Sequence, residues 1–305
     1  MSNSPFLPQT ERGMINYDPK SWLEFLFRLH RTDTVRLLFV PMLLMGAYAA
    51  FVAYIEMEVW RLNEDSQLRN VTILHTLLGF VISFLLVFRT NTAYERWWEG
   101  RKQWGALVNT SRNLSMKLAA LLPAGHADRD FFRQMIPGYA ETLKNHLRSE
   151  QTRITLFDNL PSDVQKQLDV EKHMPNQMAL MMVQRVQELY RSGILTGEQL
   201  LFLNAELTSF TDVCGACERI RNTPIPYSYT VFIKQFIFFY IMTLPLGFVF
   251  SLGYYVVPIV VFVFYVLASL EIIAEEIEEP LGGDENDLPL GNISHNIRTH
   301  IHELI

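Results

Sequence analysis

Long stretches without a charged residue place the strongest constraint on this chain of 305 residues. Residues 235–270 hold 36 uncharged residues in a row, and residues 37–55 and 71–88 hold 19 and 18. A helix needs about 20 apolar residues to cross the hydrocarbon core of a bilayer. The longest stretch exceeds one crossing, so it predicts two helices joined by a tight turn near Gly253. The sequence therefore predicts an all-α membrane protein that crosses the bilayer four times.

The region between the apolar stretches has a different character. Residues 89–230 carry apolar residues at three- and four-residue steps, which predicts amphipathic helices rather than strands. A mean hydropathy of +0.10 also indicates that membrane spans are joined to a sizeable polar part. The chain is thus divided into an amphipathic N-terminal segment (1–34), spans one and two (35–88), a helical region (89–230), spans three and four (231–270) and an acidic C-terminal segment (271–305).

Charges at the ends of the spans predict the orientation in the cell (inner) membrane. Basic residues precede the first span and follow the second, whereas the loop between these spans is acidic. Cytoplasmic loops carry an excess of lysine and arginine. Both termini and the helical region are therefore expected in the cytoplasm. The net charge of −6 argues against binding to nucleic acid, which normally requires a basic surface.

The sequence shows no motif that would indicate an enzyme. Nucleophile-elbow, zinc-protease and phosphate-loop patterns are absent from it. Cys214 and Cys217 form a C-x-x-C pair, which we interpret as two packing residues because suitably spaced further zinc ligands are missing. His300 and His302 are a weak metal signal. His75, near the start of the second span, is expected to face water.

The second span carries a regular series of aromatic residues. Phe80, Phe84 and Phe88 share one helix face and rise by about 6 Å per step. Such a seam (the Phe seam below) serves packing or lipid contact in most membrane helices. Gly79 and Ser83 beside it permit close approach of another helix. If several copies surrounded an axis, the rings would form a narrow apolar constriction that gates by dewetting.

Four passages resemble the bestrophin family of ion channels, in particular its bacterial branch. They occur in the family's order over about 210 residues and include the patterns R-x-N-x-x-Y-x-R-W-W and T-P-I-P. The passages are FVISFLLVF (80–88), RTNTAYERWWEGRKQWG (89–105), CERIRNTPIPYSYT (217–230) and EEIEEPLGGDENDLPLG (275–291).

The resemblance implies a homopentamer with an ion path along its five-fold axis. The family's hydrophobic neck uses three apolar residues spaced by four on the second span, which places it on the Phe seam. The family's second constriction is an apolar residue ahead of the third span, here Ile225 between Pro224 and Pro226. Two prolines fix φ and lack backbone donors, which favours a rigid loop.

The resemblance also bears on calcium. Calcium-gated eukaryotic members carry an unbroken acidic cluster after a P-F-G motif. In this chain Gly283 and Asn286 interrupt the cluster, leaving Asp284, Glu285 and Asp287 as its remnant. Calcium affinity depends on the number of charged ligands. We therefore expect no cofactor and no gating by calcium.

The sequence leaves two alternatives for the identity of the permeant ion. Eukaryotic bestrophins conduct chloride, whereas bacterial relatives favour monovalent cations. The neck carries no charge, but acidic residues at 56–65 and 271–287 would concentrate cations if they lined a vestibule. The expectation is therefore a sodium or potassium channel, with a chloride channel of the same architecture as the alternative. A membrane-anchored structural or signalling protein with an unknown soluble partner is the third hypothesis.

Overall fold

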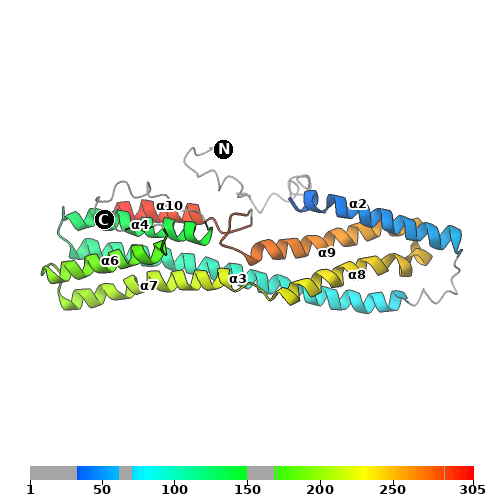
Figure 1. Ribbon diagram of the computed structural model, residues 1–305, viewed down its shortest axis with the longest axis horizontal. Helices are drawn as coiled ribbons and strands as arrows, with labels where there is room; N and C mark the ends of the chain where they lie inside the picture. Colours follow the sequence, from blue (N-terminus) through cyan, green and yellow to red (C-terminus); the bar gives the residue numbers. More distant parts are fainter. Residues whose placement is uncertain (1–32, 62–70, 150–167, 170, 285) are drawn as a thin grey trace. The chain divides into compact units, whose positions relative to one another are not determined.

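The computed structural model describes residues 33–61, 71–149, 168–169, 171–284 and 286–305, and every element in this part is helical (Figure 1). The predicted amphipathic segment lies outside the described residues up to residue 32. Two compact units are formed. The first, which we call the apolar unit, contains the described residues of Asn16–Glu95 and Pro224–Glu278. The second, the polar unit, contains the described residues of Arg96–Thr223 and Glu279–Ile305.

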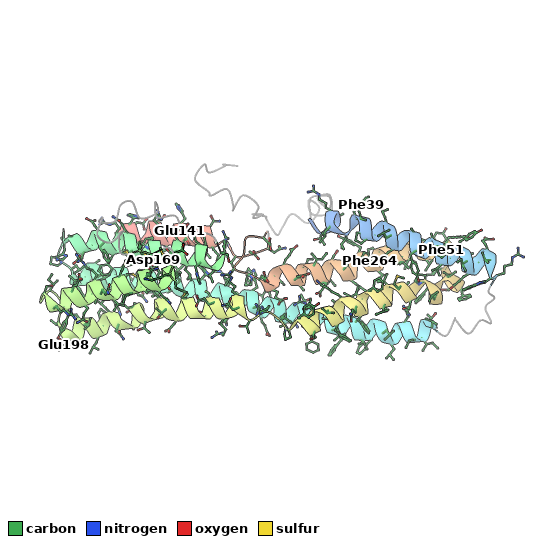
Figure 2. The ribbon with its side chains drawn as sticks, viewed as in Figure 1. Phe39, Phe51, Glu141, Asp169, Glu198 and Phe264 are labelled. Atoms are coloured by element: carbon green, nitrogen blue, oxygen red, sulfur yellow. The ribbon has the colours of Figure 1, made fainter. Side chains whose placement is uncertain are left out.

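Three helices and part of a fourth make up the apolar unit. They are α2 (Asp33–Tyr54, followed by a π-helical turn, Ile55–Val59), α8 (Tyr227–Leu252), α9 (Val256–Glu278) and the N-terminal part of α3 (Val71–Leu121). α2 packs against α9 and α8. Aromatic side chains such as Phe39 and Phe51 project from this unit (Figure 2). The stretches long and apolar enough to cross a membrane are Thr34–Val59, Val71–Leu121 and Tyr227–Glu278.

The last of these stretches is a helical hairpin. α8 and α9 pack against each other and are joined by a 3-10 turn, Gly253–Tyr255. Gly253 has φ of 53°, a left-handed conformation that glycine adopts without steric cost. The tight turn predicted near Gly253 is therefore present.

The polar unit is a bundle around a large apolar core. Its helices are α4 (Ala127–Leu147), α6 (Met174–Arg191), α7 (Gly197–Asn222), α10 (Leu290–Leu304) and the C-terminal part of α3. Leucine, isoleucine, methionine and valine side chains make up most of the core, and the Tyr139 hydroxyl inside it donates a 2.6 Å hydrogen bond to the carbonyl of Phe210. The Thr196 side chain and Gln199 form a reciprocal capping box at the start of α7.

Both cysteines of the C-x-x-C pair belong to this core. Cys214 and Cys217 are buried free thiols on α7. Burial raises the pKa of each thiol to about 12, so neither is a thiolate at neutral pH. Their interpretation as packing residues agrees with this environment.

We expect both thiols to resist modification in the folded protein. Only the thiolate is an effective nucleophile. A chromogenic disulfide reagent at about pH 8 should therefore release almost no colour from the native protein. It should titrate both cysteines after unfolding in guanidinium. Rapid reaction of the native protein would contradict the burial of these residues.

Candidate functional site

The Phe seam faces away from the core of the apolar unit. Phe80, Phe84 and Phe88 are 70%, 55% and 50% exposed in the single chain. Ile82 and Leu86, on the opposite face of the same helix, are buried among residues of α8 and α9. Packing within the chain therefore uses the aliphatic face and leaves the aromatic face for another occupant.

The rings of the Phe seam also contact one another. The centroids of Phe80 and Phe84 are 6.2 Å apart with nearly parallel planes, 16° from each other. Phe84 and Phe88 meet edge to face at 4.7 Å. Both arrangements are among those that aromatic pairs favour. The three rings form a continuous apolar surface along one side of α3.

Close packing of α3 on α8 holds the helix that carries the seam. A Cβ on Gly79 would lie 3.0 Å from the Tyr240 hydroxyl, closer than ordinary van der Waals contact, so the missing side chain of Gly79 lets α8 approach closely. The Thr72 hydroxyl donates to the carbonyl of Gly247 at 2.9 Å. Ser83 instead donates to the carbonyl of Gly79 on its own helix.

The expectation that His75 faces water is wrong. Its side chain is buried, and Nε2 lies 3.0 Å from the carbonyl oxygen of Tyr240. The imidazole also stacks on the Tyr240 ring, with centroids 4.8 Å apart. The contacts from α8 satisfy Nε2, whereas the buried Nδ1 has no hydrogen-bond partner among the described residues.

A buried ion-pair cluster follows directly after the Phe seam. Arg89 is fully buried, and its Nη1 donates to Glu278 Oε2 at 2.7 Å. Its Nε donates to Glu271 Oε1 at 3.4 Å. Buried charges must be paired to be tolerated. Arg89 therefore fixes α3 to the last turns of α9.

The same cluster holds the loop that contains Ile225. Glu278 Oε1 accepts a 2.7 Å hydrogen bond from the backbone N–H of Ile225. Because Pro224 and Pro226 have no N–H, this is the sole backbone donor of the Pro-Ile-Pro tripeptide. Sequence reasoning missed Arg89 and Glu278, although a basic residue at the end of an apolar span and acids at the end of another were visible signals.

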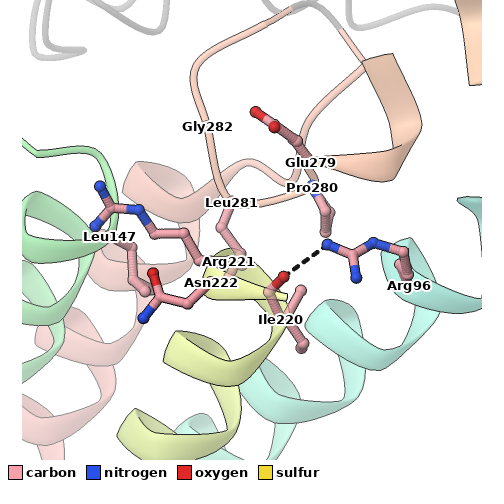
Figure 3. A pocket seen from close by; sticks show the side chains of 9 residues that line it. All are labelled: Arg96, Leu147, Ile220, Arg221, Asn222, Glu279, Pro280, Leu281 and Gly282. Carbon is pink, nitrogen blue, oxygen red and sulfur yellow. Dashed lines mark hydrogen bonds between the residues drawn. The ribbon is translucent and has the colours of Figure 1, made fainter. Parts of the chain in front are cut away.

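The arginine of the R-W-W motif has a separate role, within the polar unit. Arg96 donates to the carbonyl of Ile220 at 2.6 Å (Figure 3) and to the carbonyl of Thr223 at 2.5 Å, at the C-terminal end of α7. The last carbonyls of a helix lack intrahelical partners and carry partial negative charge. Trp97 Nε1 donates to the carbonyl of Asn286 at 3.1 Å in the acidic loop. The motif therefore secures two segments distant in the sequence.

The described part of the acidic loop contains one buried carboxylate of the expected calcium-loop remnant, Asp287. Asp287 is buried, which raises the pKa of its carboxyl to about 7, and its Oδ2 accepts a 2.7 Å hydrogen bond from the N–H of Asp284. The other carboxylate oxygen of Asp287, Oδ1, is buried and has no hydrogen-bond partner among the described residues. Glu285 lies outside the described residues.

Several of the acidic residues that were expected to line a cation-attracting vestibule are buried. Four carboxylates in 56–65 and 271–287 are buried inside the chain, where they cannot line a water-filled path: Glu56, Glu271, Glu278 and Asp287. Glu275 is exposed but forms an ion pair of 2.8 Å with Lys234. The acidic balance of the sequence therefore overstated the negative charge available to attract cations.

Comparison with known proteins identifies the family. A sequence profile described as "Bacterial/Fungal Bestrophin protein" matches residues 14–303. The chain belongs to the bacterial/fungal bestrophin family. The resemblance seen in the sequence is thus confirmed, and the family to which this bestrophin belongs is one of ion channels.

Named relatives of this bestrophin are similar over most of their length. The "voltage-dependent anion channel-forming protein" of Synechocystis sp. is 36% identical over 231 residues, which cover 74% of this chain and 75% of that protein. A protein of the same description from Escherichia coli K12 is 33% identical over 222 residues, 73% of each chain. A solved bestrophin homologue from Klebsiella pneumoniae superposes with a TM-score of 0.79 at 26% identity, over 88% of this chain and 98% of the other.

Replacing Arg89 by Met should strongly destabilise this bestrophin. The substitution leaves Glu271 and Glu278 buried without their cation, so the free energy of unfolding should fall by about 3–5 kcal/mol. Denaturant unfolding in detergent micelles measures the loss. Lys234→Met, which breaks an exposed pair, is the matched control and should cost at most about 1 kcal/mol. Equal, small losses in both variants would contradict the structural role of Arg89.

Proposed function

We propose that this bestrophin assembles as a homopentameric channel for monovalent ions, with the Phe seam as its hydrophobic neck. One observation carries the proposal. The aromatic face of α3 is exposed, whereas the aliphatic face on the opposite side of the same helix packs within the chain. Five copies around an axis would turn five such faces inward. The stacked rings would then make an apolar constriction of the kind that gates by dewetting.

The second constriction of the proposed channel is Ile225. Its side chain is partly exposed, whereas its backbone is held by Glu278 and flanked by Pro224 and Pro226. A restrained backbone keeps an apolar side chain at a fixed position without a neighbouring helix. The Pro-Ile-Pro loop therefore suits an aperture on the ion path, at the cytoplasmic side in the proposed orientation with both termini in the cytoplasm.

The permeant ion has two candidates, a monovalent cation and an anion. A preference for sodium or potassium rests on the resemblance to bacterial bestrophins, because the buried acids no longer support it. Anion passage is the second candidate, since the curated relatives described above bear names of anion channel-forming proteins. The electropositive edges of phenylalanine rings would be compatible with an anion, and the ring faces with a cation.

We further propose that conduction does not require calcium. The described acidic loop offers one buried carboxylate oxygen without a partner, and the hydrogen bonds of Asp284 and Trp97 already order this segment. Currents should therefore persist in the presence of a calcium chelator. Loss of current on chelation, restored by added calcium, would reject this part of the proposal.

Alanine substitutions in the Phe seam should raise the single-channel conductance. Phe80→Ala, Phe84→Ala and Phe88→Ala each remove a ring from the neck, so conductance in planar bilayers should rise several-fold. Ile225→Ala should alter permeation independently. Phe51→Ala, at a position on α2 that is 61% exposed, is the matched control and should conduct as the parent does. Parental currents in all the pore variants would reject the pore assignment.

The reversal potential under a KCl gradient decides the selectivity. A value near the potassium limit would establish a cation channel, and a value near the chloride limit an anion channel. Native mass spectrometry of the same preparation should show five chains of 35.4 kDa. Absence of both current and pentamer would reject the channel proposal and favour a structural or signalling role.

A further inference from the structure

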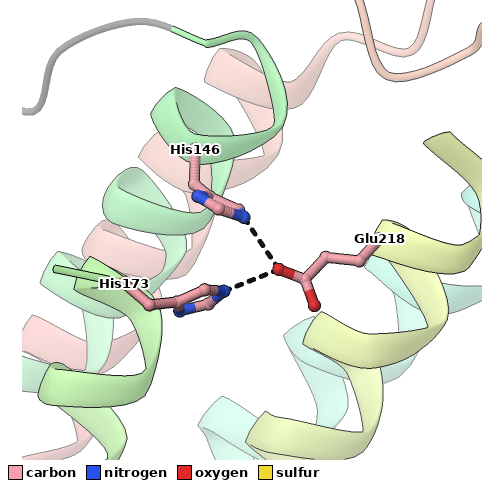
Figure 4. A group of neighbouring side chains, drawn as sticks. All are labelled: His146, His173 and Glu218. Carbon is pink, nitrogen blue, oxygen red and sulfur yellow. Dashed lines mark hydrogen bonds and ion pairs between the residues drawn. The ribbon is translucent and has the colours of Figure 1, made fainter. Parts of the chain in front are cut away.

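Three side chains from different elements converge in the polar unit, and none of them belongs to the Phe seam or to the Pro-Ile-Pro loop (Figure 4). His146 lies in the last turn of α4, His173 directly precedes α6, and Glu218 lies on α7. His146 Nε2 is 2.8 Å and His173 Nε2 2.6 Å from the same oxygen, Glu218 Oε1. The two imidazole rings are 4.4 Å apart.

The charge state of this cluster follows from its hydrogen bonds. Partial burial acts to raise the pKa of Glu218, but the hydrogen bonds from His173 and His146 outweigh it and lower the pKa below its ordinary value. The carboxylate is therefore ionised at neutral pH and acts only as an acceptor. Both Nε2 atoms must then carry a hydrogen, and their lone pairs become available when that hydrogen is lost or moved to Nδ1.

We propose that His146, His173 and Glu218 bind a zinc ion. Two imidazole nitrogens and one carboxylate, with a fourth position open to water, are a donor set that zinc adopts in proteins. The ligand atoms already lie within 4.8 Å of one another. Tetrahedral zinc with bonds of about 2.0–2.1 Å needs ligands about 3.4 Å apart. Only small side-chain rotations separate the observed cluster from that geometry.

Solvent access and the neighbouring residues support this assignment. The side chains of His146, His173 and Glu218 are 30%, 32% and 29% exposed, so an ion can reach them from water. Cys214, one turn before Glu218, is not a further ligand, because its thiol is buried and stays protonated. Zinc would tie the end of α4, the start of α6 and the C-terminal half of α7 to one another.

Zinc binding would change the cap of α6. His173 Nδ1 now accepts a hydrogen bond from the N–H of Asn176 at 3.2 Å. A neutral imidazole that binds metal through Nε2 carries its hydrogen on Nδ1 and cannot accept there. The zinc site and this cap therefore exclude each other. The consequence is useful, because His173→Asn removes the zinc ligand while asparagine remains a favourable N-cap.

Calorimetric titration of zinc chloride into the detergent-solubilised, chelator-treated full-length protein tests the site. The parent should bind one zinc ion per chain. His146→Gln, Glu218→Gln and His173→Asn should each weaken binding roughly tenfold or more. The unfolding temperature of metal-free His173→Asn should fall only slightly below that of the metal-free parent, because the cap is kept and only the hydrogen bond to Glu218 is lost.

A second capping histidine provides the control. His126 precedes α4, and its Nδ1 accepts from the N–H of Asp128 at 3.2 Å. His126→Asn changes the same residue type at an equivalent helix position, so it should leave zinc affinity unchanged. X-ray absorption at the zinc edge should show nitrogen and oxygen ligands. Parental affinity in all three ligand variants, or sulfur ligands at the zinc, would overturn the proposal.

Discussion

The buried ion pairs of Arg89 are the interaction on which the rest of the apolar unit depends. The Arg89 guanidinium pairs with Glu278 and Glu271 in an environment that excludes water, where an unpaired charge would be very unfavourable. The pairing fixes the end of the Phe-seam segment of α3 to the end of α9. Through the second oxygen of Glu278 it also fixes the backbone of Ile225. One cation thus connects the two segments that we propose as constrictions of the ion path.

Helix packing in the apolar unit follows the physics of a lipid environment. Apolar side chains gain little by leaving lipid for one another, so close backbone approach and hydrogen bonds between helices stabilise the arrangement. Gly79 beneath Tyr240, and Thr72 bonded to the Gly247 carbonyl, provide both. The exposed Phe seam has no such role within the chain. That contrast on a single helix is what distinguishes a lining surface from a packing surface in our proposal.

The polar unit is organised by long-range contacts of another kind. Arg96 secures the end of α7 through its last carbonyls, and Tyr139 joins α4 to α7 inside the core. The His146, His173 and Glu218 cluster then brings α4, α6 and α7 together at a partly exposed position. The argument for zinc binding at this cluster uses no assumption about ion conduction. The zinc proposal can therefore be tested independently of the channel proposal.

Sequence alone determined the features that depend on local pattern. The lengths of the uncharged stretches predicted the apolar helices, Gly253 marked the hairpin turn, and the spacing of Phe80, Phe84 and Phe88 defined one helix face. The partners of buried polar groups were decided only by the tertiary structure. Arg89 meets Glu278 across 189 positions of the chain, and His146 meets Glu218 across 72. His75 was placed wrongly for the same reason, because Tyr240 lies 165 positions away. Periodicity indicates which face of a helix is apolar, but only the folded structure determines which polar group on a neighbouring helix pairs with a buried polar side chain.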